Sequence, residues 1–142
     1  MSLPNVASPV AAYTPWTRTG PLVFTSGQLP VVDGTLVASG LLGAELTTEQ
    51  GAAAAETCAL NVLAIAKAAA GDLDAVRVVK LAVFVASAPG YTEQHLVANG
   101  ASQLVGRVLA ANGVHARSAI GVAQLPLGAP VEVEAIFEVL AN

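Results

Sequence analysis

HARSAIGVAQLP (residues 115–126) and VEVEAIFEV (residues 131–139) make up most of the last quarter of the chain and decide its fold. Both segments are rich in residues that favour strands, and the Leu-Gly-Ala-Pro segment between them is typical of a turn. The sequence therefore predicts two strands joined by a Pro/Gly turn, which we interpret as a hairpin.

Charged side chains are scarce in this chain, so a charge inside an apolar strand needs a reason. The first strand carries Arg117, and the second carries the carboxylates of Glu132, Glu134 and Glu138. A buried charge without a partner costs several kcal/mol or shifts its pKa. We therefore expect Arg117 either to form a salt bridge within the hairpin or to bind a ligand carboxylate bidentately. A simple hairpin pairs Arg117 with Glu138, so a site shared with Glu132 requires a bulged turn or a second subunit.

The N-terminal third of the chain predicts short strands. Residues 11–18 alternate loosely, Leu22–Gln28 forms a clear strand pattern, and residues 35–38 predict a short third strand. The second of these strands ends at Ser26-Gly27, where the missing Cβ allows a ligand or another backbone to approach closely.

Two helices are predicted from apolar side chains at three- and four-residue spacing. The first begins at a capping box formed by Thr47 and Gln50, continues to Ala70 and ends at Gly71. The second runs from about residue 92 to about residue 112.

The segment between the helices, Val76–Ala86, is apolar at nearly every position, which is typical of a strand covered on both faces. The predicted order is therefore β-β-(β)-α-β-α-β-β within one domain, residues 1–142. Two helices on one face of a mixed sheet make the expected fold class α+β.

Composition restricts the function. Charged residues make up 11% of the chain, against roughly 25% in soluble domains, which predicts apolar surface buried between subunits. The net charge of −4 argues against a nucleic-acid partner. We expect no signal peptide and no apolar run of the roughly 18 residues that a membrane span needs. The expected location is therefore the cytoplasm, with no membrane partner.

The cysteine and the histidines form no pattern typical of a metal or nucleophile site, so no metal is expected. Cys58 cannot form an internal disulfide because it is the single cysteine, and its helical apolar pattern predicts a buried thiol. We interpret His95, on the second helix, and His115, at a strand start, as surface or capping histidines.

Several motifs together resemble the RidA/YjgF family of reactive-intermediate deaminases, also described as endoribonuclease L-PSP. TSGQLP at residues 25–30 is similar to the family's strand-and-turn motif, and Tyr13 precedes it at the family's distance. The Arg-Ser pair at Arg117 matches the family's signature, with Glu132 at the family's spacing after it. The resemblance covers essentially the whole chain.

The resemblance implies a chorismate-mutase-like fold, assembled as a homotrimer whose sheets form an inner barrel with clefts between subunits. It implies no cofactor. The implied catalytic residues are Arg117, which binds a substrate carboxylate, and Glu132, which positions or activates water. The implied substrate-binding residues are Tyr13, Ser26, Gly27, Asn99 and Arg117.

The chain departs from the family's pattern at four places. Ala119 stands where the archetypal deaminases have a cysteine, and the segment leading into Tyr13–Trp16 is altered. Leu127 replaces a basic residue, and one extra residue separates Asn99 from Arg117. The altered segment at Tyr13–Trp16 bears most on the identity of the substrate.

Three functions stay open on the sequence. The leading hypothesis is a cofactor-free hydrolase that converts a small 2-imino or enamine acid, such as 2-aminoacrylate, to the 2-oxo acid and ammonia. The second is a trimeric protein that binds 2-oxo acids and related small carboxylates without turnover. The third is a ribonuclease, which the acidic charge and the absence of a basic patch argue against.

Overall fold

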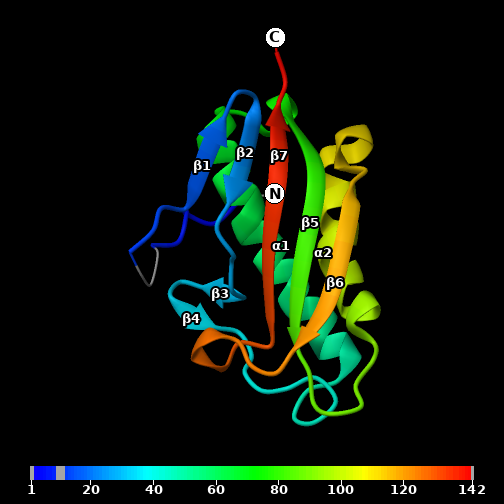
Figure 1. Cartoon of the computed structure of the whole chain (residues 1–142). Helices are drawn as coiled ribbons and strands as arrows, with labels where there is room; N and C mark the ends of the chain where they lie inside the picture. Colours follow the sequence, from blue (N-terminus) through cyan, green and yellow to red (C-terminus); the bar gives the residue numbers. More distant parts are fainter. Residues whose placement is uncertain (1, 9–11, 142) are drawn as a thin grey trace.

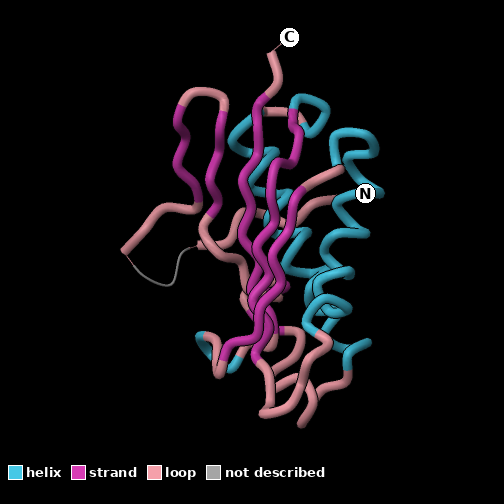
Figure 2. Tube along the Cα trace, turned by 45° about the vertical axis from the view of Figure 1, so that its right-hand side comes forward, coloured by secondary structure: helices cyan, strands magenta, loops and turns pink. Residues whose placement is uncertain are grey.

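The computed structural model describes residues 2–8 and 12–141 and shows one sheet with two helices packed on one of its faces (Figures 1 and 2). Ala11, where the first strand was expected to begin, lies outside the described residues. The prediction of an α+β fold with both helices on one face of a mixed sheet is confirmed.

The main sheet has the order β1-β2-β7-β5-β6, and a small second sheet pairs β3 with β4. The strands are β1 (Trp16–Thr19), β2 (Leu22–Thr25), β3 (Val31–Val32), β4 (Thr35–Leu36), β5 (Val76–Ala86), β6 (Ala116–Val122) and β7 (Val131–Val139). The helices are α1 (Thr48–Ala70) and α2 (Gln94–Leu109), and short 3₁₀ turns are η1 (Leu73–Ala75), η2 (Ala110–Gly113) and η3 (Pro126–Gly128).

The predicted C-terminal hairpin is wrong, because β5 lies between β6 and β7. β5 pairs in parallel with β6 and antiparallel with β7, and both pairings extend along most of its length. A parallel neighbour has to be reached by a crossover, which α2 provides here. β5 is the most continuously apolar strand, so the central position buries the largest share of its apolar surface.

α1 begins and ends where its local signals predict. Thr47 is the N-cap, the capping box with Gln50 is formed on both sides, and Gly71 ends the helix in the left-handed conformation. The predicted buried thiol is also confirmed, since Cys58 is fully buried in the core.

α1 is long and apolar enough, by length and composition, to cross a membrane, which the sequence reading had not expected. Its mean hydropathy is 1.3 over an 18-residue window, and 56% of that window is buried inside the fold. The helix packs against the sheet on one side and against α2 beside it, which accounts for its apolar composition.

α2 is shorter than predicted at both ends. It begins at Gln94 and ends at Leu109, and the predicted last turn is the 3₁₀ segment η2. Ala110 has a positive φ of 52°, which ends the α-helical geometry. Gly113 closes the turn in a tight space, where a Cβ would lie 2.7 Å from the carbonyl oxygen of Val105.

The two faces of the sheet differ. Val131, Val133, Ala135 and Phe137 of β7 point into the core beneath the helices, and the alternate residues point to the open face. On that open face Phe24 and Ile120 are 37% and 49% exposed. Within the described residues, no helix or strand covers this face. β5 was predicted to be covered on both faces, and a single chain covers it only on the face where the helices pack.

Gly100→Ala should destabilise the protein, although alanine normally favours a helix by about 1 kcal/mol. A Cβ at Gly100 would overlap the backbone carbonyl of Ala52, at the closest approach of α1 and α2. Overpacking of this kind costs about 1–3 kcal/mol, which chemical denaturation would measure. Gly106→Ala in the same helix is the matched control, because a Cβ there meets nothing within 4 Å. Equal effects of the two substitutions would contradict the close helix contact.

Candidate functional site

Arg117 lies on β6 and its side chain points to α2, on the helix-covered face of the sheet. Its Nη1 donates hydrogen bonds to Asn99 Oδ1 at 2.9 Å and to Ser102 Oγ at 3.1 Å. Its Nη2 donates to the carbonyl oxygen of His95 at 3.3 Å. All three acceptors are neutral groups of one helix, and Asn99 is thus brought to Arg117 despite the extra residue between them.

One edge of the Arg117 guanidinium has no hydrogen-bond partner in the described part of the chain. A guanidinium carries five N–H donors, and the three bonds to α2 occupy both donors of Nη1 and one of Nη2. The Nε–H and the second Nη2–H are left, and these two lie on the same edge of the group. A carboxylate binds to such an edge through two parallel hydrogen bonds.

The interpretation of Arg117 as a salt-bridge partner within the chain is wrong. The ion pairs within the described residues are Arg77–Glu138 at 2.8 Å and Arg107–Glu56 at 3.2 Å. Glu138, the carboxylate expected opposite Arg117 in a hairpin, is therefore bound to a residue of β5. The cause is the strand order, since β5 separates Arg117 from every glutamate of β7.

His115, interpreted as a surface or capping histidine, does contact the carbonyl at the end of η2, and it is in addition part of this arrangement through Ser102. Its Nε2 lies 2.9 Å from Ser102 Oγ, and its Nδ1 lies 2.6 Å from the carbonyl oxygen of Gly113. Its ring is partly buried. Sequence reasoning missed Ser102 and His115 because their proximity depends on the parallel alignment of β6 with the crossover helix.

Glu132 lies on the open face of β7, next to a bulge in the neighbouring segment. Ala135 N donates to Thr25 Oγ1, and Gln28 then pairs with Val133 through two backbone hydrogen bonds. Three residues of one segment thus advance opposite two of β7, as in a β-bulge. Gly27 occupies this bulge against the Glu132 carboxylate, which a Cβ at position 27 would overlap.

The Glu132 carboxyl is half-buried, and its pKa is raised from the usual glutamate value. Burial is the larger cause, and the neighbouring carboxylate of Glu134 adds to it. A raised pKa makes a carboxyl group a better proton acceptor and a better reservoir for the proton it has taken.

A third residue that sequence reasoning missed is Asn61 of α1, which fixes the segment after Gly27. Its buried side-chain amide donates to the carbonyl oxygens of Leu29 and Val31, each at 3.0 Å. These bonds tie the TSGQLP turn to the core. The polar residue within an otherwise apolar helix was the available signal.

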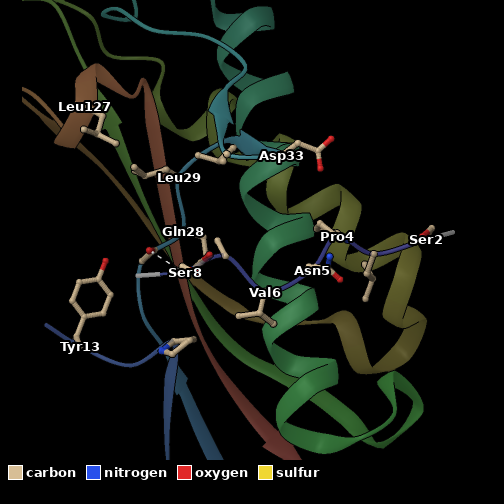
Figure 3. Close-up of a pocket in the computed structure, with 16 residues that line it drawn as sticks. Ser2, Pro4, Asn5, Val6, Ser8, Tyr13, Gln28, Leu29, Asp33 and Leu127 are labelled. Carbon is tan, nitrogen blue, oxygen red and sulfur yellow. Dashed lines mark hydrogen bonds between the residues drawn. The ribbon is translucent and has the colours of Figure 1, made fainter. Parts of the chain in front are cut away.

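Tyr13 and Ser26 lie in the same region as Gly27. The Ser26 hydroxyl donates to the carbonyl oxygen of Thr14, and the Tyr13 ring is 45% exposed. Tyr13 and Gly27 line a cavity of about 740 Å³ between the β2–β3 segment and the N-terminal residues 2–8. Figure 3 shows Tyr13 and the N-terminal residues on opposite sides of Gln28.

The structure therefore separates the predicted site residues into two groups. Arg117 is in register with Leu81 and through it with Ala135, both on the core face, whereas Glu132 is in register with Phe84 on the open face. Arg117 and Glu132 lie two strand spacings apart across the sheet and three residues apart along it, together roughly 14 Å, and their side chains leave the sheet in opposite directions. One chain brings Asn99 to Arg117 but does not bring Arg117 to Glu132.

Comparison with known proteins identifies relatives over almost the whole chain. A model of the endoribonuclease L-PSP family matches residues 4–139. Protein TCP17 of Trypanosoma cruzi is 51% identical over 140 residues, which cover 97% of this chain and 88% of that protein.

Solved structures share the fold as well. Atu1372 of Agrobacterium tumefaciens, a protein described as of unknown function, is 49% identical with a TM-score of 0.89, covering 94% of this chain and 86% of that one. TdcF of E. coli, solved with bound serine, is 26% identical with a TM-score of 0.65, covering 98% of this chain and 94% of that one.

Glu132→Gln should raise the thermal midpoint at neutral pH. Because the folded-state pKa of Glu132 is raised, the protonated carboxyl contributes stability at low pH, and this is lost as the pH rises through that pKa. Glutamine does not ionise, so the advantage of the variant should disappear as the pH falls to the usual glutamate value of 4.5.

The measurement is the thermal midpoint of wild type and of Glu132→Gln at pH values from neutral down to 4.5. Glu138→Gln is the control, because it breaks the exposed pair with Arg77 and should cost up to about 1 kcal/mol at neutral pH. A Glu132→Gln variant that is less stable than wild type at neutral pH would mean that the ionised carboxylate has a cationic partner.

Proposed function

The chain belongs to the endoribonuclease L-PSP family, the family of RidA and YjgF, and we propose that it is a cofactor-free deaminase of small 2-imino and enamine acids. The products are the corresponding 2-oxo acid and ammonia. The observation that carries this proposal is the Arg117 guanidinium, which three neutral oxygens of α2 hold in place with one bidentate edge free of partners in the described chain.

A carboxylate on the free edge of Arg117 fits the charge distribution of the protein. The guanidinium lacks an ion-pair partner among the described residues, so an anion gains its full attraction without displacing an internal carboxylate. A planar fork also fixes the orientation of the acid, which places its C2 carbon at a defined position. Asn99 supports the site by accepting a hydrogen bond from Nη1, which is not part of the free edge.

The proposed reaction is the hydrolysis of a carbon–nitrogen double bond. An enamine acid first takes a proton at its terminal carbon and becomes the imine. Water adds to the electrophilic C2 carbon while Glu132 accepts a proton from it, and that proton passes to the nitrogen. The hydroxyl proton of this adduct then also passes through Glu132 to the nitrogen, and the carbon–nitrogen bond breaks as the hydroxyl oxygen becomes the carbonyl and ammonia leaves. No electrons are gained or lost, so hydrolysis requires no redox partner.

The active assembly in this proposal is a homotrimer, with Arg117 of one subunit facing Glu132 of its neighbour. The two residues lie on opposite faces of one sheet, so they can share a substrate only across an interface. Exposed apolar side chains on the open face, Phe24 and Ile120 among them, support such an association. Tyr13, Ser26 and Gly27 then belong to the Glu132 side of the cleft.

The alternative is a protein that binds small carboxylates without turning them over. The bound serine in the E. coli TdcF structure favours this alternative, because it is a small amino acid held by a related fold. The Arg117 edge alone is sufficient for binding, whereas turnover also requires Glu132. The ribonuclease description of the family is less suited to a chain with a net charge of −4.

Two variants distinguish enzyme from binder. Arg117→Ala should weaken binding of 2-oxobutyrate by at least tenfold, since hydrogen bonds to charged groups contribute about 1.5–3 kcal/mol. Glu132→Gln should retain binding and lose about 10²–10⁴-fold in turnover, as expected for a general base. Calorimetry measures the first, and ammonia release from 2-aminoacrylate generated in situ measures the second.

The binding and turnover measurements lead to different conclusions. Wild-type binding without ammonia release would establish the binder, and equal affinity in Arg117→Ala would remove Arg117 from the site. Arg107→Ala is the matched control, because Arg107 is an exposed arginine of α2, the helix that Arg117 contacts, and it is paired with Glu56.

The assembled protein should have a mass near three times the 14.2 kDa of one chain, measured by light scattering. Ile120→Asp, on the open face of β6, should dissociate it because a carboxylate would be buried in the interface. The dissociated variant should also lose turnover, since neither half of the site is complete. A wild-type protein that stays monomeric at micromolar concentration would contradict the trimer and the shared cleft together.

A further inference from the structure

A chain of hydrogen bonds runs behind Arg117 and ends on the protein backbone. Arg117 Nη1 lies 3.1 Å from Ser102 Oγ, which lies 2.9 Å from His115 Nε2. His115 Nδ1 lies 2.6 Å from the carbonyl oxygen of Gly113. The chain therefore joins α2, the turn η2 and the start of β6.

The chemistry of the groups assigns one direction to this chain. The Gly113 carbonyl can only accept, so His115 Nδ1 carries the proton that is donated to it. In the neutral imidazole Nε2 is then an acceptor, and the Ser102 hydroxyl donates to it. Arg117 can only donate, and it donates to the Ser102 oxygen. Each group thus has its partner, and the Ser102 hydroxyl hydrogen has one orientation that satisfies both neighbours.

The backbone end of the chain is closely packed against α2. Gly113 is buried, and a Cβ there would crowd the carbonyl oxygen of Val105 and the Cα of Gly106. His115 is bonded to this closely packed turn through Nδ1, and its Nε2 contacts the Ser102 hydroxyl.

We propose that Ser102 and His115 are positioning residues that fix the plane of the Arg117 guanidinium, so that its free edge faces the carboxylate of the substrate. Asn99 and the His95 carbonyl hold the far end of the group, and Ser102 holds the second donor of Nη1. Three hydrogen bonds fix the plane of the guanidinium. If the bond to Ser102 is lost, the two that remain allow the group to rotate. This inference rests on the proposed function, in which Arg117 binds the substrate carboxylate.

The test compares variants that break the chain with variants that keep it. Ser102→Ala removes the hydroxyl, and His115→Phe removes the acceptor for it. Ser102→Thr keeps the hydroxyl, and His115→Gln keeps an acceptor oxygen. Binding of 2-oxobutyrate should weaken roughly five- to tenfold in the first two, the value of one hydrogen bond, and the second two should restore most of it.

Kinetics and additivity separate positioning from a purely structural tie. In the imine assay the loss should fall on KM more than on kcat, because Ser102 and His115 do not touch the reacting atoms. The double variant Ser102→Ala/His115→Phe should bind no more weakly than the single variants, since both break the same chain. In an Arg117→Lys background the Ser102 substitution should have no effect on affinity, because an ammonium group has no plane to fix.

A measurement without ligand tests the same inference independently. Rotation about the Nε–Cζ bond of Arg117, followed by ¹⁵N NMR in the full-length protein, should be faster in Ser102→Ala than in wild type and Ser102→Thr. If wild type binds no 2-oxo acid, or Arg117→Ala binds it equally, the proposed function fails and the rotation rate alone decides. Unchanged rotation in Ser102→Ala, or unchanged affinity with a lowered thermal midpoint, would overturn the positioning role.

Discussion

The pairing of β5 with a parallel strand on one side and an antiparallel strand on the other is the constraint on which the rest of the structure depends. It places β6 and β7 on opposite edges of one strand, and it fixes which residues of each share a face. Arg117 consequently joins the polar side of α2, and Glu132 joins the open face beside Gly27. The distribution of the chemistry follows from strand order and from the two-residue period of a strand.

Local signals in the sequence identified the helices and most strands. The capping box at Thr47 and the glycine at position 71 predicted α1 to within one residue of its observed start, because both act within a single turn of the chain. The end of α2 was less well predicted, since it depends on the positive φ of Ala110, which an alanine side chain does not favour.

Long-range pairing explains what the sequence did not reveal. A hairpin was the simplest arrangement of β6 and β7, yet burying β5 on both of its edges outweighs that short connection. The same pairing removed the expected Arg117–Glu138 contact and created the contacts of Arg117 with Asn99, Ser102 and His95. The family resemblance predicted Arg117, Asn99 and Glu132 as site residues. Neither the residue patterns nor the resemblance pointed to Ser102 or His115.

The turn η2 has a consequence for how this chain tolerates changes in length. A one-residue insertion inside β6 would invert its faces and move Arg117 to the other side of the sheet. The same insertion in the loop that precedes the strand leaves those faces unchanged, as long as the loop can fold the additional residue away. Val114, which joins η2 to β6 and is 79% exposed, lies where an additional residue would leave the packing of Gly113 on α2 in place. An insertion before the strand would therefore leave the Arg117 guanidinium on the side of the sheet where Asn99 lies, whereas an insertion within the strand would separate the two.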